Sequence, residues 1–333
     1  MVAPQYSGVP PLLDPLLVTL QEIRDAAELL QGIAVRTPLL QFPAAGPAAW
    51  LKPENLQPVG AFKIRGAYVA IARLPEAARA RGVVTHSSGN HAQGIARAAR
   101  LLGVTAIAVM PENAPPLKVQ RTIADGADVV FSGNAPDDRV ALAHRIAEER
   151  GMALISSYDD RDIIAGQGTV GLEIAEDAPS GALTVYVPVS GGGLASGVAS
   201  ALKGLRPDVR VIGVEPELAA DALESLREGA IVRWTADRTG RTIADGLRVQ
   251  ALGVLPFAHL RAYLDGVVTV SEAEILEAMR VLAVDARIVA EPSGAVAPAA
   301  LLRERPADRT SVAVVSGGNV DPELYARVLA GMS

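Results

Sequence analysis

Short apolar runs alternate with amphipathic runs along most of this chain. A short apolar run bounded by turn residues is typical of a buried strand, whereas apolar positions that recur every three or four residues indicate a helix. In the first half, the strand-like runs cover residues 82–85, 104–110, 127–131 and 152–155, and the helix-like runs between them cover residues 92–102, 117–124 and 137–150. This alternation predicts a parallel sheet covered by helices, and we expect residues 69–156 to form a small α/β domain.

The same alternation returns in the second half of the chain. Its strand-like runs cover residues 183–189, 209–214, 267–270 and 312–315, and its helix-like runs lie near residues 170–176, 194–203, 271–286 and 294–303. The stretch 221–256 is less regular. Three helix starts carry capping residues, namely Thr19 with Glu22, Ser271 with Glu274, and Asp321 with Pro322.

Two short strand-like runs, residues 36–39 and 50–52, precede the small domain. The small domain separates them from the second alternation, and we expect them to pack on the C-terminal half. The sequence therefore predicts a discontinuous large domain, residues 1–68 and 157–333. The expected fold class is α/β with two domains, each a mainly parallel sheet flanked by helices.

The composition narrows the class of protein. The chain of 333 residues is long enough for two domains. A net charge of −6 without a basic run argues against a nucleic-acid partner, and the absence of cysteine excludes disulfides and thiolate metal sites. No apolar run reaches the roughly 18 residues that a membrane helix needs, and the N-terminal residues lack the layout of a signal peptide. We therefore expect a cytoplasmic protein without a membrane partner.

Lys63 has the clearest chemical context, within the segment 60–66 (GAFKIRG). It would lie in the first turn of a helix, where the helix dipole disfavours a further positive charge. A lysine whose pKa is lowered so that it can act as a nucleophile fits this place better than a charged one. The alternative is an exposed lysine near a helix start with no chemical role.

A second candidate is the glycine loop, residues 190–194 (SGGGL), between a strand-like and a helix-like run. Glycines at a helix start let backbone N–H groups converge on a phosphate. A tight turn without a ligand is one alternative. Another is a dinucleotide fingerprint formed by Gly191, Gly193 and Gly197, with Glu215 placed to bind a ribose, as in an NAD(P)-dependent oxidoreductase. That alternative gives no role to Lys63 or to the segment 87–91 (SSGNH).

Three segments, residues 87–91, 190–194 and 316–319, each follow a strand-like run and precede a helix-like one. Together with residues 60–66 they resemble, in order and spacing, the serine/threonine dehydratase and serine racemase family of pyridoxal-phosphate enzymes. The resemblance covers the chain from about residue 19 to the C-terminus, and it implies a homodimer with a fold-type II architecture, similar to the tryptophan synthase β subunit. It also implies that pyridoxal 5′-phosphate is bound through Phe62, Lys63, Asn90, Ser190, Gly191, Gly192, Gly193, Leu194 and Ser316.

The resemblance further implies individual roles. Lys63 would form an imine with the cofactor, the phosphate would rest on the glycine loop, and Asn90 would donate to the ring 3′-oxygen. Ser190 stands where many relatives have a glycine, and its hydroxyl can still donate to phosphate. The carboxylate of an amino-acid substrate would bind at a helix start, through Ser87, Ser88, Gly89, Asn90 and His91.

Ser316 matches the residue that faces the pyridine nitrogen. A neutral hydroxyl cannot keep this nitrogen protonated as a carboxylate would, so the ring is a weaker electron sink. This favours α,β-elimination over transamination, with water and ammonia leaving L-threonine or L-serine to give a 2-oxo acid. Ser88 matches the racemase-like branch, which includes hydroxyaspartate dehydratases, where it carries a proton on the face opposite Lys63. Its alternative role is a hydroxyl of the carboxylate loop. Tyr158, which stands where some racemases have Asn, is more similar to the threonine dehydratases.

Glu215, the carbonyl of Ala219 and Asp221 match a divalent-cation site of the same branch. Oxygen ligands suit Mg²⁺, or else Ca²⁺ or Mn²⁺, and the alternative is a pair of solvated carboxylates. The expected function is therefore a threonine/serine ammonia-lyase, with serine racemase or threo-3-hydroxyaspartate dehydratase as the alternative within the family. A non-catalytic amino-acid sensor is the alternative outside the enzymes. The chain ends soon after its last predicted helix, so no regulatory domain is expected.

Overall fold

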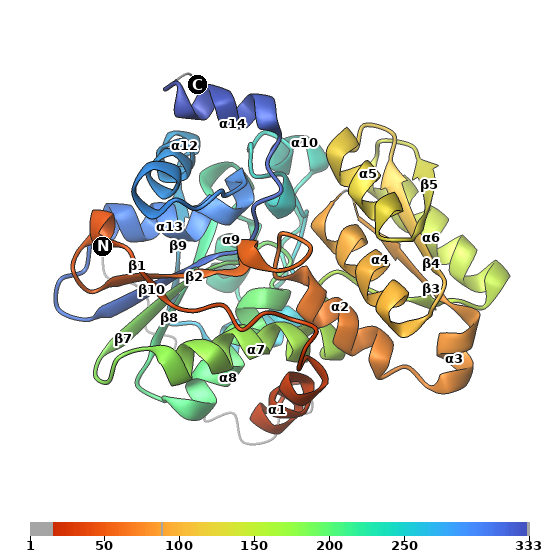
Figure 1. Cartoon of the computed structure of the whole chain (residues 1–333), viewed down its shortest axis with the longest axis horizontal. Helices are drawn as coiled ribbons and strands as arrows, with labels where there is room; N and C mark the ends of the chain where they lie inside the picture. Colours follow the sequence, from red (N-terminus) through yellow and green to blue (C-terminus); the bar gives the residue numbers. More distant parts are fainter. Residues whose placement is uncertain (1–15, 88, 332–333) are drawn as a thin grey trace.

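The computed structural model describes residues 16–87 and 89–331, and it has two domains side by side, each built on its own sheet (Figure 1). The larger sheet has the strand order β1-β2-β10-β7-β8-β9, and the smaller has the order β5-β4-β3-β6. This confirms the predicted fold class.

The larger sheet joins both ends of the chain. Its strands are β1 (Leu40–Gln41), β2 (Ala49–Pro53), β7 (Leu183–Pro188), β8 (Arg210–Pro216), β9 (Gly266–Val270) and β10 (Thr310–Val315). All neighbours pair in parallel except β1 and β2. The pairing of β2 with β10 places Trp50 opposite Val312, so the N-terminal segment packs on the C-terminal half as predicted.

The smaller sheet is wholly parallel. Its strands are β3 (Val83–His86), β4 (Ala106–Pro111), β5 (Asp128–Ser132) and β6 (Ala153–Leu154). The helices around it are α2 (Lys63–Ala72), α3 (Glu76–Arg81), α4 (Asn90–Leu102), α5 (Pro116–Ala124) and α6 (Pro136–Arg150). Alternate residues of β3 face opposite layers, because Val83 packs with α2 and α4 whereas Val84 packs with α6.

Helices cover both faces of the larger sheet. They are α1 (Leu20–Leu29), α7 (Arg161–Asp177), α8 (Gly193–Leu205), α9 (Asp221–Glu228), α10 (Ala236–Thr239), α11 (Val254–Tyr263), α12 (Glu272–Val281), α13 (Pro292–Glu304) and α14 (Pro322–Leu329). Val312 and Val314 of β10 pack against α7, α8 and α11, whereas Ala313 and Val315 pack against α12 and α13 (Figure 1). The central strands are therefore buried on both sides, which explains their continuous apolar runs.

The three capping predictions are confirmed. Thr19 and Ser271 each form a capping box, and Asp321 accepts hydrogen bonds from the first turn of α14. The predicted strand at residues 36–39 is wrong, because the strand lies at β1 and is antiparallel. Helix α7 begins at Arg161, well before the predicted start near residue 170. Its glycines lower helix propensity and hid this part of the helix.

Two further differences concern the C-terminal half. The stretch 221–256, expected to be less regular, contains α9, α10 and the start of α11. The helix that begins after Ser271 is α-helical only to Val281 and then continues as a π-helical turn, Leu282–Ala286. No helix among the described residues is long and apolar enough to cross a membrane.

Candidate active site

Lys63 is the first residue of α2 and lies against the end of β10. The backbone N–H of Phe62 donates to the carbonyl oxygen of Ser316 at 3.1 Å, and Ala61 forms an isolated bridge with Gly317. The amine of Lys63 donates to the carbonyl oxygen of Ser157 at 2.8 Å and lies 4.9 Å from the centre of the Phe62 ring. Removal of the amine from solvent lowers the pKa of Lys63 to about 8, which favours a nucleophilic lysine over a merely exposed one.

The glycine loop forms the start of α8 and shares neighbours with Lys63. Tyr158, which follows the carbonyl that Lys63 contacts, packs against the loop so closely that a Cβ at Gly191 would lie 2.4 Å from its ring. Gly192 has a φ of 95° and Ser190 has a φ of 55°. Both values lie in the positive-φ region that favours glycine. The hydroxyl of Ser190 donates to the carbonyl oxygen of Gly246 at 3.1 Å.

Ser316 lies at the end of β10, next to the segment that carries Lys63. Strand β10 lies between β2 and β7, so the residues after β7 and β10 emerge at the same edge of the sheet. The Ser316 hydroxyl is buried and donates to the carbonyl oxygen of Ser293 at 3.3 Å. The structure thus brings together Lys63, the glycine loop and Ser316, three segments that lie far apart in the sequence.

Asn90 stands at the start of α4, on the side of the smaller domain. Its amide Nδ2 donates to Glu291 Oε1 at 2.5 Å, and its Oδ1 accepts from Asn319 Nδ2 at 2.9 Å. Gly89 is the N-cap of α4, and its N–H lies 3.3 Å from Ser87 Oγ. This helix start can receive an anion.

His91 is buried just inside α4. Burial, followed by the charge of Lys63, holds the pKa of His91 well below its usual value, so the ring stays neutral. Because the ring is neutral, His91 adds no positive charge to that of Lys63 at the start of α4. Ser88, the second predicted catalytic residue, lies outside the described residues.

Three charged residues near Asn90, namely Lys118, Asp245 and Glu291, were not predicted to belong to the site. Lys118 on α5 forms ion pairs with Asp245 at 2.5 Å and with Glu291 at 3.2 Å. Burial by itself would lower the pKa of Lys118, but the charges of Glu291 and Asp245 outweigh burial and raise it. The only signal for Glu291 in the sequence was a proline at the next position, which is typical of a helix start and carries no chemical meaning.

Gln167 on α7 was also missed. In the described part of the chain, neither atom of its buried amide has a hydrogen-bond partner. The amide lies between α2 and the glycine loop, since a Cβ at Gly193 would be 3.0 Å from Gln167 Oε1 and a Cβ at Gly66 would be 3.2 Å from Gln167 Nε2. An unpaired buried amide, an amine with a lowered pKa and a glycine-rich helix start fit a phosphorylated aldehyde such as pyridoxal phosphate.

Arg139 on α6 lies in the same region. Burial lowers the pKa of Arg139, and Tyr158 partly offsets this effect. The positive charge of Arg139 also acts on His86. Burial first, and this charge second, lower the pKa of His86 to about 4. Among the described residues, no group accepts a hydrogen bond from the buried Nε of Arg139. This guanidinium is therefore available for a further anion.

The predicted metal ligands lie together at the end of β8. Glu215 accepts from the N–H groups of Ala222 at 3.2 Å and Leu223 at 2.8 Å, and Ala219 ends a short 3₁₀ helix, Glu217–Ala219. Neither carboxylate oxygen of Asp221 has a hydrogen-bond partner on another described residue. Burial raises the pKa of Asp221 to about 7, and burial followed by the charge of Asp221 raises the pKa of Glu215.

A divalent cation fits this pair of carboxylates. The described residues contain no cluster of three or more His, Asp or Glu side chains placed for a metal, so backbone and water oxygens would have to complete the coordination.

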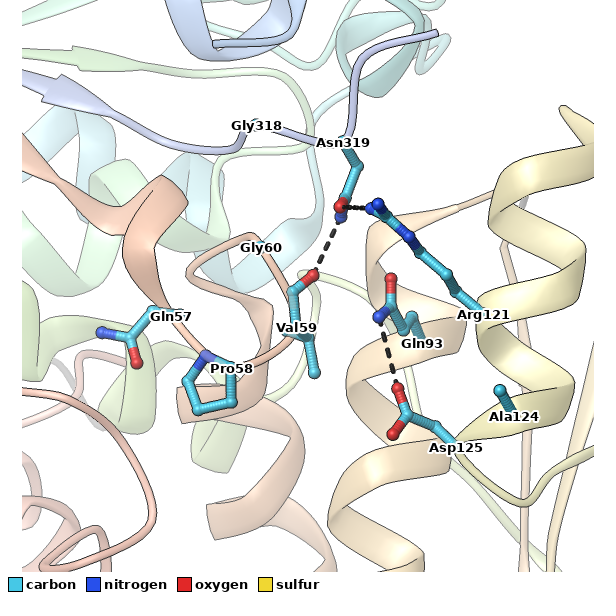
Figure 2. A pocket seen from close by; sticks show the side chains of 10 residues that line it. All are labelled: Gln57, Pro58, Val59, Gly60, Gln93, Arg121, Ala124, Asp125, Gly318 and Asn319. Carbon is cyan, nitrogen blue, oxygen red and sulfur yellow. Dashed lines mark hydrogen bonds between the residues drawn. The ribbon is translucent and has the colours of Figure 1, made fainter. Parts of the chain in front are cut away.

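A pocket of about 480 Å³ adjoins the site, and Lys63 is not among its lining residues (Figure 2). Its walls are Gln57, Pro58, Val59, Gly60, Gln93, Arg121, Ala124, Asp125, Gly318 and Asn319. Asn319 connects the pocket to Asn90.

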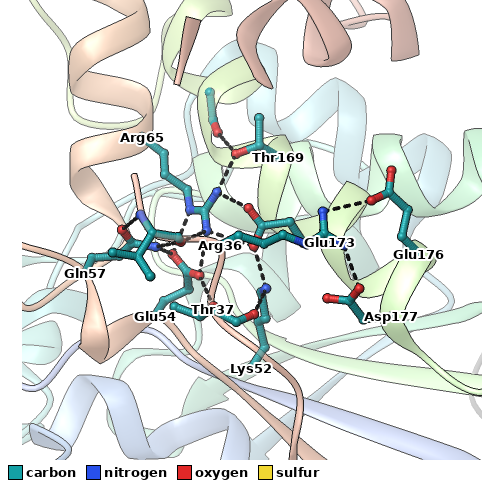
Figure 3. A network of polar contacts seen from close by, with 12 residues as sticks. Arg36, Thr37, Lys52, Glu54, Gln57, Arg65, Thr169, Glu173, Glu176 and Asp177 are labelled. Carbon is teal, nitrogen blue, oxygen red and sulfur yellow. Dashed lines mark hydrogen bonds and ion pairs between the residues drawn. The ribbon is translucent and has the colours of Figure 1, made fainter. Parts of the chain in front are cut away.

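A network of buried, paired charges fixes α2 to its neighbours (Figure 3). Arg65, two residues after Lys63, pairs with Glu54 at 2.8 Å and with Glu173 of α7 at 2.7 Å. Lys52 of β2 also pairs with Glu173, at 2.5 Å. The network therefore fixes the helix that carries Lys63 to both β2 and α7.

Comparison with known proteins agrees with this geometry. The family model described as "Pyridoxal-phosphate dependent enzyme" matches residues 30–317. An L-threonine ammonia-lyase of Thermotoga maritima is 43% identical, with 94% of this chain and 78% of the relative covered. An L-threo-3-hydroxyaspartate ammonia-lyase of a Pseudomonas species is 44% identical, with 95% of this chain and 99% of the relative covered. The solved structure of maize serine racemase matches with a TM-score of 0.87 and 36% identity, covering 94% of this chain and 97% of that one.

The family match decides between the two interpretations of the glycine loop. It favours the monophosphate site over the dinucleotide fingerprint, and the buried Glu215, which accepts two backbone hydrogen bonds, is not placed to bind a ribose. The chain belongs to the family of pyridoxal-phosphate dependent enzymes.

Proposed function

We propose that the chain is an ammonia-lyase that removes water and ammonia from L-threonine and L-serine to give a 2-oxo acid. The observation that carries this proposal is the amine of Lys63, with its lowered pKa, beside the glycine loop and Ser316. The identity with L-threonine ammonia-lyase of Thermotoga maritima supports it.

Lys63 has two tasks in this proposal. With a pKa of about 8, roughly a tenth of the free amine is neutral at pH 7, so it can attack the cofactor aldehyde. The bound cofactor supplies an electron sink for the bond that breaks at Cα. As a free amine, Lys63 would take the Cα proton of the substrate and could deliver a proton to the leaving hydroxyl, which departs as water.

Other residues hold and orient the reacting groups. The N–H groups of Gly191 and Gly193 and the amide of Gln167 would hold the phosphate at the start of α8, whereas the N–H of Gly192 donates to the carbonyl oxygen of Val189 and shapes the loop. Ser316 would place a neutral hydroxyl at the ring nitrogen, which favours elimination over transamination. Leu194 belongs to the hydrophobic core on the α7 and α8 side of the larger sheet, and Phe62 packs against that core. Both would contact the bound cofactor.

The start of α4 would bind the substrate carboxylate. Gly89, Asn90 and His91 carry the first N–H groups of this helix, and Ser87 lies beside them. Ser88 completes the loop in this proposal, either as a carboxylate ligand or as the proton carrier on the opposite face. The second role would add racemisation of serine to elimination.

A second candidate substrate is L-threo-3-hydroxyaspartate. The buried guanidinium of Arg139 has an unpaired Nε near Tyr158 and would bind a second carboxylate. The Pseudomonas L-threo-3-hydroxyaspartate ammonia-lyase, 44% identical, supports this candidate.

We also propose that Glu215, the carbonyl of Ala219 and Asp221 bind Mg²⁺, with Ca²⁺ or Mn²⁺ as alternatives. Because a ligand that binds only the folded state stabilises it, Mg²⁺ at about 100 times its dissociation constant should add about 2.7 kcal/mol to the free energy of unfolding. Thermal unfolding with Mg²⁺ or EDTA measures this. Asp221→Asn should abolish the effect, whereas Glu217→Gln, an exposed neighbour, should keep it. Equal stabilisation of both variants by Mg²⁺ would exclude this site.

The assembly proposals concern the whole chain. We propose a cytoplasmic homodimer in which residues 69–156 move as one domain. Two exposed apolar side chains, Leu56 and Val289, support association, because they lie in segments joined by the hydrogen bond from Asn55 to the carbonyl of Val289. Light scattering would test the oligomeric state, and a monomer at all concentrations would contradict it.

A chemical experiment tests the central proposal. The purified protein with pyridoxal phosphate should show a visible absorption band. Borohydride reduction should remove this band and leave the cofactor as a covalent label on Lys63. It should release ammonia from L-threonine, L-serine or L-threo-3-hydroxyaspartate. A band without ammonia release would indicate a non-catalytic amino-acid sensor instead, and a label on another lysine would exclude the proposed site.

A further inference from the structure

The amide of Asn319 joins the pocket of Figure 2 to Asn90. Arg121, on α5 of the smaller domain, donates from its guanidinium to Asn319 Oδ1 (Figure 2). Asn319 follows β10 in the larger domain. This contact therefore crosses between the domains, next to the site.

The other half of the Asn319 amide is fixed by two acceptors. Its Nδ2 donates to the carbonyl oxygen of Val59 at 2.9 Å and to Asn90 Oδ1 at 2.9 Å. A backbone carbonyl can only accept, so the amino group of Asn319 must face Val59 and the oxygen must face Arg121. The hydrogen-bond partners at the two ends of the Asn319 amide therefore allow the same single orientation.

This orientation dictates that of Asn90. Because Asn90 Oδ1 already accepts from Asn319, its amino group must point the other way, where it meets Glu291 Oε1 at 2.5 Å. If the Asn90 amide turned over, its amino group would face the amino group of Asn319. Two donors would then oppose each other without an acceptor.

Two glycines leave room for this arrangement. A Cβ at Gly60, whose φ is 70°, would lie 2.5 Å from Asn319 Oδ1. A Cβ at Gly317 would lie 3.1 Å from Asn90 Nδ2 and would collide with Glu291. The backbone on both sides is therefore shaped around the two amides.

We propose that Asn319 is a positioning residue that directs the amino group of Asn90 toward the cofactor ring oxygen, and that Arg121 holds Asn319 in place from the opposite domain. The inference rests on the proposed cofactor contact of Asn90. If residue 319 offered an acceptor in place of its amino group, the Asn90 amino group could turn from Glu291 toward residue 319 and the Asn90 carbonyl would face the ring oxygen, so that two acceptors repel. An acceptor placed there would favour the form in which the proton lies on the ring oxygen rather than on the Lys63 nitrogen.

Asn319→Asp is the informative substitution. Aspartate has nearly the same shape and can still accept from Arg121, but it cannot donate to Asn90. With one hydrogen bond to a charged group lost, pyridoxal phosphate should bind about tenfold more weakly. The absorption spectrum of the bound cofactor should shift from the longer-wavelength to the shorter-wavelength band, with the longer-wavelength band falling by at least half.

Three variants control the experiment. Arg121→Lys keeps a cationic donor and should stay within twofold of the wild type in both measurements. Asp125→Asn changes the same pocket wall but not the amide chain, and should also stay within twofold. Arg121→Met should shift the spectrum in the same direction as Asn319→Asp. It remains informative if Asn319→Asp does not fold, because Arg121 is not fully buried.

A double-mutant cycle separates positioning from a structural effect. If Asn319 acts through Asn90, then Asn319→Asp should cause no further spectral shift in an Asn90→Ala protein. An additive shift, or a wild-type spectrum for Asn319→Asp and Arg121→Met, would overturn the inference. A wild-type protein without any visible band would instead overturn the proposed cofactor site itself.

Discussion

At the scale of single residues, the site depends on groups whose pKa is shifted by burial. Among the described residues, the Ser157 carbonyl is the one hydrogen-bond acceptor of Lys63, and the charge of Lys63 is disfavoured both by burial and by the helix start. Lys118, which pairs with the same Glu291 that accepts from Asn90, keeps its charge because two carboxylates face it. Burial therefore acts on both lysines but shifts the pKa in opposite directions, because Lys118 has carboxylate partners and Lys63 has none among the described residues.

The lowered pKa of Lys63 predicts a pH dependence of stability in the cofactor-free protein. The folded state releases the proton near pH 8 and the unfolded state near pH 10.5, so between these values the unfolded state binds more protons. The free energy of unfolding should therefore rise with pH in this window, by up to about 3 kcal/mol. Urea unfolding of the wild type and of Lys63→Met at both ends of the window measures it. A rise of the same size in Lys63→Met would show that Lys63 is not the cause.

Arg139 predicts the substrate range. Arg139→Met should lower kcat/KM for L-threo-3-hydroxyaspartate by about 10- to 100-fold, because a charge-assisted hydrogen bond to the second carboxylate is lost. L-threonine has no such carboxylate, and its kcat/KM should change much less. Arg145→Met, an exposed arginine on the same helix, is the control and should change neither. Equal losses on both substrates would contradict the assignment.

At the scale of elements, glycines let helices approach closely enough to shape the cleft. Gly197 of α8 packs against α7, where an added Cβ would lie 2.3 Å from the carbonyl oxygen of Ile164 and 2.5 Å from the nitrogen of Gly168. The start of α8 is the proposed phosphate site, so this helix contact also sets the position of the glycine loop. In the dinucleotide interpretation Gly197 belonged to a fingerprint, whereas here it serves helix packing.

Gly197→Ala should destabilise the protein by about 3 kcal/mol, since backbone atoms cannot yield to the added methyl group as a side chain could. Gly204→Ala on the same helix is the matched control. Its Cβ would meet only the flexible side chain of Leu20, at 3.3 Å, and should change stability by no more than about 1 kcal/mol. Chemical denaturation of both variants tests this, and equal stability of the two would disprove the packing argument.

At the scale of the whole molecule, the buried charges behind Lys63 join three parts of the chain that are far apart in sequence. Lys52 and Glu54 come from the N-terminal segment, Arg65 from α2 and Glu173 from α7 (Figure 3). Lys52, Glu54 and Arg65 are each no more than 1% exposed. Because each charge is paired, the loss of one partner would leave another buried charge uncompensated.

Arg65→Met should therefore lower the free energy of unfolding by about 3 to 5 kcal/mol. Arg36→Met removes a neighbouring arginine whose pairs with Glu176 and Asp177 are exposed, and it should cost no more than about 1 kcal/mol. The comparison uses equilibrium unfolding in urea with the cofactor removed. A loss below 1 kcal/mol for Arg65→Met would show that the network is not needed for stability.

The sequence by itself determined the local elements and the family. Periodic apolar positions located both sheets and most helices, because burial imposes a spacing that each segment carries on its own. Capping at Thr19, Ser271 and Asp321 was predictable because it involves residues three positions apart or fewer. The glycine-rich α7 and the helices between residues 221 and 256 were missed, because packing against neighbours stabilises them more than their own propensity does.

Only the tertiary structure decided which side chains surround the predicted residues. Glu291, Lys118 and Asp245 lie far apart in the chain and look like ordinary surface charges, yet they meet beside Asn90. The orphaned amide of Gln167 and the fixed amide of Asn319 are likewise invisible in the sequence. Pairing, burial and the direction of a hydrogen bond depend on distances in space, and these distances are set when the two domains come together.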